Sequence, residues 1–174
     1  MPNKKSQDAI ALLKADHRKV EDLFEKYQSA RGRKAEIAHE ICLELTVHTM
    51  IEEEIFYPAC REGGVESDMM DEANVEHDGA KVLISELENG APDDDYYDAK
   101  VKVKVLSEEI KHHVKEEEQT GGIFTGARKA KLDLEALGEQ MAARKHELMA
   151  QFAKKLPPLK TLTMTAPALE PVAA

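Results

Sequence analysis

Two short stretches of the chain contain a histidine and a glutamate that are four residues apart. HTMIEEE contains His48 and Glu52, and HHVKEEE contains His113 and Glu117. Residues four apart on an α-helix lie on the same face, one turn from each other. An imidazole nitrogen and a carboxylate oxygen placed in this way can bind one metal ion, and the carboxylate can reach a second ion. Each stretch is therefore a candidate half of a site for two metal ions.

The second stretch also allows another pairing. Its alignment with the first stretch as an internal repeat selects His112 and Glu116. The apolar face of the surrounding segment instead selects His113 and Glu117. We prefer the pair on the apolar face because burial is what makes a position a ligand position. A buried polar group without a partner is costly, and a metal ion removes that cost. His112 is then expected near the surface of the protein.

Stretches that contain glycine, and in one case proline, divide the chain into five segments of helical length. The dividing stretches are SARGRK, CREGGVESD, ENGAPDDD and QTGGIFTGA, and the fifth segment runs from about Arg128 to Lys155. No segment shows the sustained alternation of a β-strand. Short connections favour antiparallel neighbours. The sequence therefore predicts an all-α fold, an up-down-up-down four-helix bundle with an additional C-terminal helix and a disordered tail.

The predicted organisation has three parts. Residues 1–120 form the four-helix bundle, residues 121–156 form a loop and the additional helix, and residues 157–174 form a tail rich in Pro, Thr and Ala that is expected to be disordered. The additional helix places five apolar residues near one face, so it is expected to pack on the bundle or on a second copy of the chain. These residues are Leu134, Leu137, Met141, Leu148 and Phe152.

The apolar face of each bundle helix is interrupted by one histidine. On the second and fourth helices a glutamate follows four residues later, and the other glutamates of the two runs are expected to stay solvated. Metal coordination removes the cost of burying four imidazoles and two carboxylates. Mixed imidazole and carboxylate ligands suit iron or manganese, with zinc as a further alternative. The six predicted ligands are His17, His48, Glu52, His77, His113 and Glu117.

The same spacing predicts which side chains continue the buried face beyond Glu52. Alternate steps of three and four residues place Ile55 and Ala59 on that face. Tyr57 falls just beside it. The sequence therefore does not show whether this tyrosine approaches the metal ions.

The charge balance limits the partners of the protein. The net charge is −10, which argues against nucleic acid or an anionic membrane as the main partner. No apolar stretch is long enough to span a bilayer, and the start of the chain lacks the apolar region of a signal peptide. The two cysteines form no disulfide framework. We therefore predict a cytoplasmic protein without a nucleic-acid or membrane partner.

The segments around the six residues resemble the hemerythrin-like, or HHE cation-binding, family. DHRKVEDLF, HTMIEEEIFYP, EHDGAK and HHVKEEE occur in the family's order over residues 16–118. The resemblance implies that the six residues bind two non-haem iron ions, in preference to manganese or zinc, and that Glu52 and Glu117 bridge them. It further implies a small ligand such as O2, NO or peroxide.

Two features depart from the family pattern. Oxygen-carrying hemerythrins have a fifth histidine in an HxxxH pair on the third helix, whereas Ala73 and Lys81 lie four residues before and after His77. One iron ion should therefore have fewer protein ligands, and water, a carboxylate or a tyrosine is expected to fill the position. The stretch EEEQTGGIFTGAR, after the fourth helix, is longer than in the family and lacks proline. It is expected to close the site differently.

Four functions are consistent with these residues. The favoured one is a diiron protein that binds or senses dioxygen or a related small oxidant. The first alternative is an enzyme that decomposes hydrogen peroxide or nitric oxide at the same site. The second is an iron-handling or iron-sensing protein, with a protein partner or a second copy of the chain at the C-terminal helix. The third is a helical interaction module without a metal ion.

Overall fold

The computed structural model describes residues 7–90 and 96–165 of the chain. Every regular element in these ranges is helical. The elements are α1 (Ala9–Ser29), α2 (Lys34–Ile51), η1 (Glu52–Phe56), α3 (Tyr57–Glu62), α4 (Ser67–Asn89), α5 (Tyr96–Glu118), α6 (Ile123–Lys129) and α7 (Leu134–Phe152). Because η1 is a π-helical turn between two α-helices, α2, η1 and α3 form one continuous rod.

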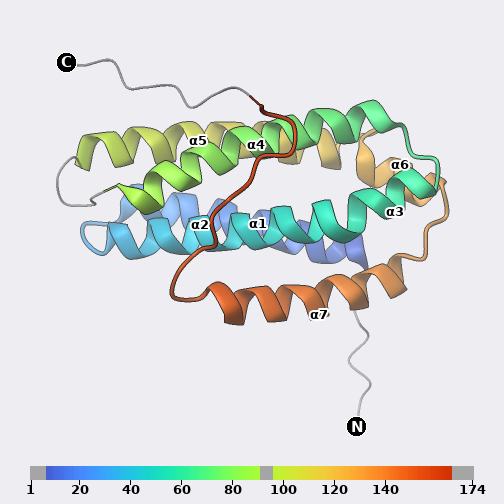
Figure 1. Ribbon diagram of the computed structural model, residues 1–174, viewed down its shortest axis with the longest axis horizontal. Helices are drawn as coiled ribbons and strands as arrows, with labels where there is room; N and C mark the ends of the chain where they lie inside the picture. The colour runs from blue at the N-terminus through green and yellow to red at the C-terminus, as the bar shows by residue number, and fades with distance from the viewer. Residues whose placement is uncertain (1–6, 91–95, 166–174) are drawn as a thin grey trace, which may run out of the picture.

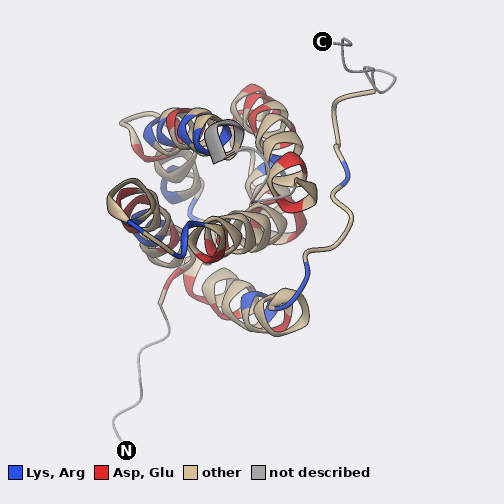
Figure 2. Cartoon of the chain, turned by 90° about the vertical axis from the view of Figure 1, so that its left-hand side faces the viewer, with Lys and Arg blue, Asp and Glu red and all other residues tan. Residues whose placement is uncertain are grey.

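Four long rods form an antiparallel bundle, with α1, the α2–η1–α3 rod, α4 and α5 running back and forth (Figure 1). An end-on view shows the four rods around a common core and α7 outside them (Figure 2). The predicted four-helix bundle with an additional C-terminal helix is therefore confirmed. Of the two placements expected for that helix, α7 packs on its own bundle, against α1 and α2. No helix in the described ranges is long and apolar enough to cross a membrane.

The face predicted to be buried on the second rod shifts at η1. Ile55 and Ala59, which the spacing selected, are only partly buried, whereas Phe56, Tyr57 and Cys60 are buried. A π turn contains one residue more than an α turn, so the inward face advances by one position along the sequence. The proline that follows η1 cannot donate the backbone hydrogen bond that an uninterrupted α-helix needs there. The prediction was wrong because it assumed an unbroken helical period.

The predicted fifth helix is shorter than expected, and part of the preceding loop is helical. The sequence predicted a helix from about Arg128 to Lys155, but α7 begins at Leu134 and ends at Phe152. Asp133 caps its start by accepting a hydrogen bond from the backbone N–H of Ala136 at 3.0 Å. The helix α6 occupies part of the stretch interpreted as a loop, and its apolar face is buried. The short connection therefore carries a helix of its own.

The close packing of α7 on α1 depends on a glycine inside α7. A Cβ atom at Gly138 would lie 2.3 Å from the carbonyl oxygen of Gln7 and 2.8 Å from the backbone nitrogen of Ala9. We expect Gly138→Ala to destabilise the protein by about 1–3 kcal/mol, because backbone atoms cannot move aside as a flexible side chain can. The measurement is urea unfolding followed by circular dichroism.

Gly79, within α4, provides the matched control. A Cβ atom there meets nothing closer than 3.9 Å. Alanine favours a helix interior over glycine by roughly 0.5–1 kcal/mol, so Gly79→Ala should stabilise the protein. Equal effects of the two substitutions would contradict the close approach of α7 and α1.

The segment after α7 crosses the bundle and is held by one buried carboxylate. It runs in front of α2 to reach α4 (Figure 1). The backbone N–H groups of Leu162, Thr163 and Met164 donate to Asp78 at 2.6–3.1 Å, and the Thr163 hydroxyl donates to it at 2.7 Å. Residues 166–174 of the tail predicted to be disordered lie outside the described residues.

Candidate metal centre

Two groups of metal-ligand atoms lie in the middle of the bundle and share one residue. All of the residues are buried, and the ligand atoms within each group lie within 4.8 Å of one another. The first group is His17, His48, Glu52 and Glu117, and the second is Glu52, His77 and His113. The structure therefore brings together all six residues that the sequence predicted as ligands, although ligation itself stays a prediction.

Glu52 connects the two groups through its two oxygens. Nε2 of His48 lies 3.2 Å from Oε1, and Nε2 of His77 lies 3.3 Å from Oε2. Glu52 is fully buried, and its position at the start of the π turn directs the side chain into the core. A carboxylate with one histidine at each oxygen is arranged as a bridge between two cations.

Glu117 is the second central carboxylate. Its Oε2 atom lies 3.3 Å from Nε2 of His17 and 3.6 Å from Nε2 of His113. Nε2 of His113 also lies 3.3 Å from Nε2 of His77. The Nε2 atoms of all four histidines therefore face the interior of one small volume, to which each bundle rod contributes.

Four atoms of this volume form no hydrogen bond, although they face one another in two pairs at 3.2–3.3 Å. Nε2 of His17, Nε2 of His48, Oε1 of Glu52 and Oε2 of Glu117 are buried without a hydrogen-bond partner. Buried polar atoms are almost always paired, because an unpaired one costs about 1–3 kcal/mol. Their lone pairs are the ligand types that iron, manganese and zinc accept. The residues present therefore fit the metal ions that the fold implies.

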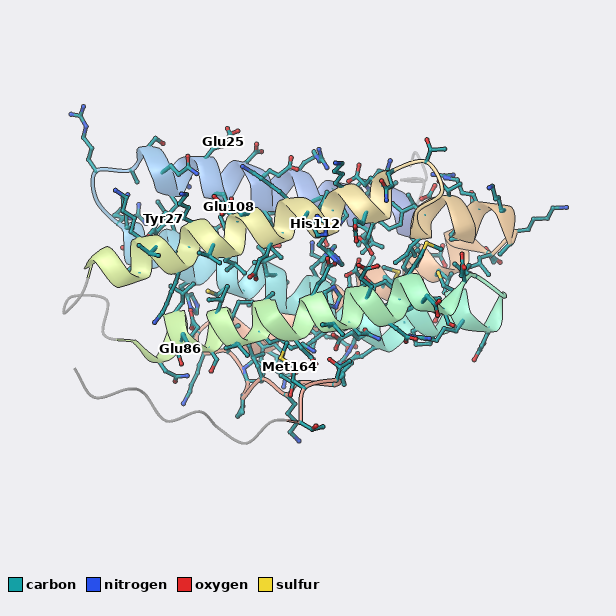
Figure 3. The ribbon with its side chains drawn as sticks, turned by 90° about the horizontal axis from the view of Figure 1, so that it is seen from above. Glu25, Tyr27, Glu86, Glu108, His112 and Met164 are labelled. Carbon is teal, nitrogen blue, oxygen red and sulfur yellow. The ribbon has the colours of Figure 1, made fainter. Side chains whose placement is uncertain are left out.

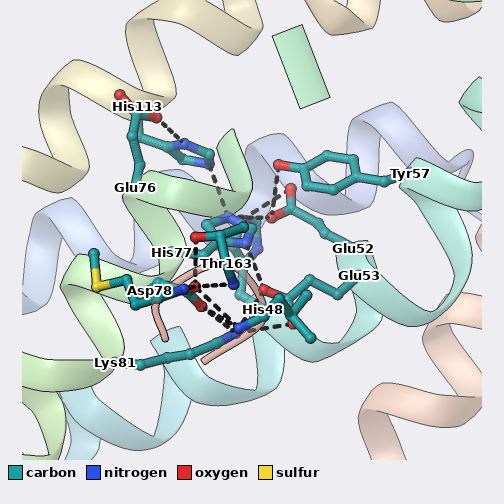
Figure 4. A network of polar contacts seen from close by, with 12 residues as sticks. His48, Glu52, Glu53, Tyr57, Glu76, His77, Asp78, Lys81, His113 and Thr163 are labelled. Carbon is teal, nitrogen blue, oxygen red and sulfur yellow. Dashed lines mark hydrogen bonds and ion pairs between the residues drawn. The ribbon is translucent and has the colours of Figure 1, made fainter. Parts of the chain in front are cut away.

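A carboxylate faces the outer nitrogen, Nδ1, of every central histidine. The pairs are His17 with Glu118 at 2.7 Å, His48 with Asp16 at 3.5 Å, His77 with Glu53 at 3.1 Å and His113 with Glu76 at 2.8 Å. Such a partner fixes the ring orientation and leaves Nε2 free to bind a metal ion. Figure 4 shows the contacts of His77 and His113. We call these four residues the outer carboxylates.

Three of the outer carboxylates in turn contact cationic side chains. The contacts are Asp16 with Lys145, Glu53 with Lys81 at 2.8 Å and Glu118 with Arg18 at 2.8 Å. Sequence reasoning missed this outer set, and it assigned Glu53 and Glu118 to a solvated face. A signal was nevertheless present, because each outer carboxylate is the chain neighbour of a predicted ligand. The neighbours are Asp16 before His17, Glu53 after Glu52, Glu76 before His77 and Glu118 after Glu117.

The carboxylates shift the protonation of the metal-free centre. Burial by itself lowers the pKa of His48, but Glu52 and Asp16 outweigh burial and raise it to about 10. Burial acts in the same direction on His77, and there Glu52 and Glu53 raise the pKa to about 9. These histidines in turn hold the pKa of Glu52 well below its ordinary value, against the effect of burial. The metal-free centre therefore holds protons that bound cations would displace.

Tyr57 is a central residue that the sequence left unplaced. Its hydroxyl donates a hydrogen bond to Oε1 of Glu117 at 2.8 Å. The same hydroxyl lies 3.5 Å from Oε2 of Glu52 (Figure 4). Its ring stacks on the ring of His77, with centroids 5.6 Å apart. Burial and the two carboxylates raise the pKa of Tyr57 well above its ordinary value. The extra residue in η1 is what turns this phenol toward the centre.

The short helix α6 covers the centre with an aromatic side chain. The Phe124 ring stacks on His17 with centroids 5.9 Å apart and meets Phe56 edge-on at 5.8 Å. Phe124 is itself buried. The stretch that was expected to close the site therefore covers it with a helix, whose phenyl ring lies over the His17 side. The difference from the family stays a prediction.

The two pairings considered for HHVKEEE have different environments. His113 and Glu117 are buried in the centre. His112 is exposed and Glu116 half-buried, and together with Glu76 they form a third group of closely spaced ligand atoms outside the core. The apolar pattern therefore selected the buried pair correctly, and the repeat alignment selected a surface pair.

The comparisons agree with this geometry. The family model described as Hemerythrin HHE cation binding domain matches residues 8–120. No curated protein and no solved structure matches the chain. The matched range contains both central groups and covers well over half of the chain. The chain therefore belongs to the hemerythrin HHE cation-binding domain family, and its buried histidine and glutamate groups could hold metal cations.

Proposed function

We propose that this protein is a non-haem diiron protein that binds or senses dioxygen or a related small oxidant, such as NO or peroxide. The observation that supports this proposal is the pair of buried groups that share Glu52, with four Nε2 atoms directed at two carboxylates. His17, His48, Glu52 and Glu117 would hold one iron ion, and Glu52, His77 and His113 the other. Two iron ions held by these residues would supply redox chemistry and positions at which a small ligand binds.

The residues around the centre restrict what can reach it. A cavity of about 10 Å³ touches His17, His48, His77 and His113, and its other walls include Val20 and Ile110. That volume is close to the minimum needed for one water molecule, so only a very small ligand fits beside the histidines without a rearrangement. The walls also include Asp16 and Thr49, so the size of the cavity, and not its polarity, restricts the ligand.

A second candidate function is the decomposition of hydrogen peroxide or nitric oxide at the same centre. It is favoured by the smaller group, in which Glu52, His77 and His113 are not joined by a fifth histidine. Ala73 and Lys81 lie four residues from His77, and Lys81 is bound to Glu53. An iron ion with fewer protein ligands is better suited to catalytic turnover than to reversible oxygen carriage.

The experiment that tests the proposal begins with metal-free protein loaded with ferrous iron without oxygen. Elemental analysis should give two iron ions per chain, and exposure to O2, NO or peroxide in separate samples should change the visible absorption spectrum. Steady-state consumption of peroxide or NO would select the enzymatic candidate. A chain that takes up no iron, or whose spectrum stays unchanged with all three ligands, contradicts the proposal.

Tyr57→Phe tests whether the phenol completes the smaller iron site. We expect the ferric protein to have a visible phenolate-to-iron charge-transfer band, because a ferric ion beside the Tyr57 oxygen displaces the phenol proton as cations do from other ligands. The substitution should remove the band while iron content stays at two per chain. Tyr27→Phe is the matched control, because Tyr27 is buried but lies some three helical turns from His17 along the same helix. A band that persists in Tyr57→Phe would contradict ligation by this residue.

A further inference from the structure

A third group of metal-ligand side chains lies at the solvent-facing edge of the α4–α5 interface. Nε2 of His112 lies 3.3 Å from Oε1 of Glu76 and 3.3 Å from Oε1 of Glu116. The His112 side chain is 60% exposed, and Figure 3 shows it on α5. We call His112, Glu76 and Glu116 the rim group. One imidazole and two carboxylates, with open positions for water, form a three-ligand set that divalent transition metals accept.

Glu76 belongs both to the rim group and to the outer carboxylates. It contacts His112 where each of the other three outer carboxylates contacts a lysine or an arginine. Glu76 binds Nδ1 of His113 through Oε2 at 2.8 Å, as Glu118 binds His17 and Glu53 binds His77. Its second oxygen faces His112 instead of a permanent cation. In the described part of the chain, no lysine or arginine forms an ion pair with Glu76. This outer carboxylate therefore lacks the fixed positive charge that its three counterparts have.

The surface around the rim group attracts cations and reaches the buried centre. A pocket of about 430 Å³ between α4 and α5 is lined by Glu76, Glu108, Glu109 and His112 and extends to His113. Burial and the nearby Glu76 carboxylate raise the pKa of Glu109, as expected where negative charge is concentrated. Glu108 pairs with Lys104 at 3.7 Å, so Glu76 and Glu109 are the carboxylates of this pocket that can raise the local concentration of cations.

A second and smaller pocket joins the rim group to the centre directly. Its volume is about 90 Å³, and its walls include Glu76 and Glu116 from the rim group and His113 and Glu117 from the centre. Oε2 of Glu117 is buried and has no hydrogen-bond partner. A cation at the rim group therefore lies beside a pocket that also contains His113 and Glu117 of the centre.

We propose that the rim group is an additional divalent-cation site that delivers iron to the buried centre. Glu76, His112 and Glu116 bind a hydrated ferrous ion. The ion then moves past Glu76 and exchanges its water for His113 and Glu117. The cation-binding half of this proposal is independent of the diiron function, whereas the delivery half rests on it.

The binding half is tested with cobalt(II), whose visible spectrum reports imidazole and carboxylate ligands. Protein with its centre already filled with iron should bind one further Co²⁺ ion per chain. His112→Ala and Glu116→Gln should each weaken that binding by at least roughly tenfold, the typical loss when even an outer partner of a metal ligand is removed. His146→Ala removes an exposed histidine from α7 and serves as the control. Unchanged cobalt binding in His112→Ala overturns the site.

The delivery half is tested by the rate at which metal-free protein takes up Fe²⁺ without oxygen. Samples are passed through a desalting column at successive times, and their iron is measured. His112→Ala should slow uptake by roughly tenfold and still reach the final iron content of the unmodified protein, whereas His146→Ala should match the unmodified rate. Equal rates in all three proteins overturn delivery. If the unmodified protein never reaches two iron ions per chain, the diiron function fails. The rim site is then decided by titrating Co²⁺ into metal-free protein, in which His112→Ala should bind about one ion fewer per chain than His146→Ala.

Discussion

Glu52→Gln is expected to remove both metal ions from the protein, whereas Glu54→Gln should leave metal binding unchanged. Glu52 belongs to both central groups, and each of its oxygens lies 3.2–3.3 Å from a histidine Nε2 atom. Glutamine has nearly the same shape but no negative charge, so neither ion keeps its shared ligand. Loss of one ordinary ligand would weaken a single site, but this substitution affects two.

The same substitution should also destabilise the metal-free protein. Removing one partner of a buried ion pair typically costs about 3–5 kcal/mol, because the remaining charges have no compensation. Glu52 is fully buried beside His48 and His77. Glu54 is exposed and pairs with Arg144 at 2.8 Å. The loss of such a surface pair costs about 0–1 kcal/mol.

Two measurements on the matched pair of variants check this prediction. Elemental analysis after loading gives the metal content, and urea unfolding of the metal-free proteins gives the stability. If Glu52→Gln retained both ions with unchanged affinity, Glu52 would not be the shared ligand. If Glu54→Gln lost metal to the same extent, the effect would reflect general charge and not the position of the side chain.

The sequence predicted the helices and the six central residues because both depend on one regular pattern. Apolar residues at helical spacing identify the inward faces, and a histidine on such a face is conspicuous. His113 was chosen over His112 on this basis, and the structure buries the first and exposes the second. Buried polar residues on the inward face of a helix can therefore be predicted from spacing alone, whereas their role as ligands stays a prediction.

The remaining features of the site depend on departures from that pattern. Tyr57 reaches the centre only because the π turn adds one residue, and nothing in a fixed period indicates such an insertion. Phe124 lies in a stretch whose glycines indicate a loop. The outer carboxylates come from neighbouring helices, so their contacts depend on the register and rotation of the packed rods. Helical spacing within one segment specifies neither quantity.

Metal removal is expected to destabilise the protein by an amount that grows as the pH rises. Each ion contributes about 4 kcal/mol when its free concentration is about 1,000 times its dissociation constant. In the metal-free protein, the Glu52 carboxylate is instead balanced by the protonated rings of His48 and His77. Those protons dissociate at high pH. The metal-free protein then loses the positive charges that balance the Glu52 carboxylate.

The stability of the metal-free protein falls with rising pH because the pKa values of its two histidines are raised. The pKa of His48 is raised to about 10 and that of His77 to about 9, against an ordinary value of about 6.5 in the unfolded chain. Protonation therefore contributes stability that is complete below about pH 6.5 and is lost as the pH rises through about 9 to 10. In the loaded protein the rings are neutral ligands, and this loss does not occur.

Thermal unfolding of loaded and metal-free protein at about pH 6.5 and about pH 9.5 measures the difference. Every other ionisable group is common to the two samples, so the loaded protein is the control for general alkaline effects. The gap between the two unfolding temperatures should widen at the higher pH. A gap that stays constant or narrows would contradict the prediction, because it would show that the folded metal-free centre holds no more protons than the unfolded chain. Because Glu52 contributes to the raised pKa of both histidines, metal-free Glu52→Gln should lose less stability between the two pH values than the metal-free unmodified protein.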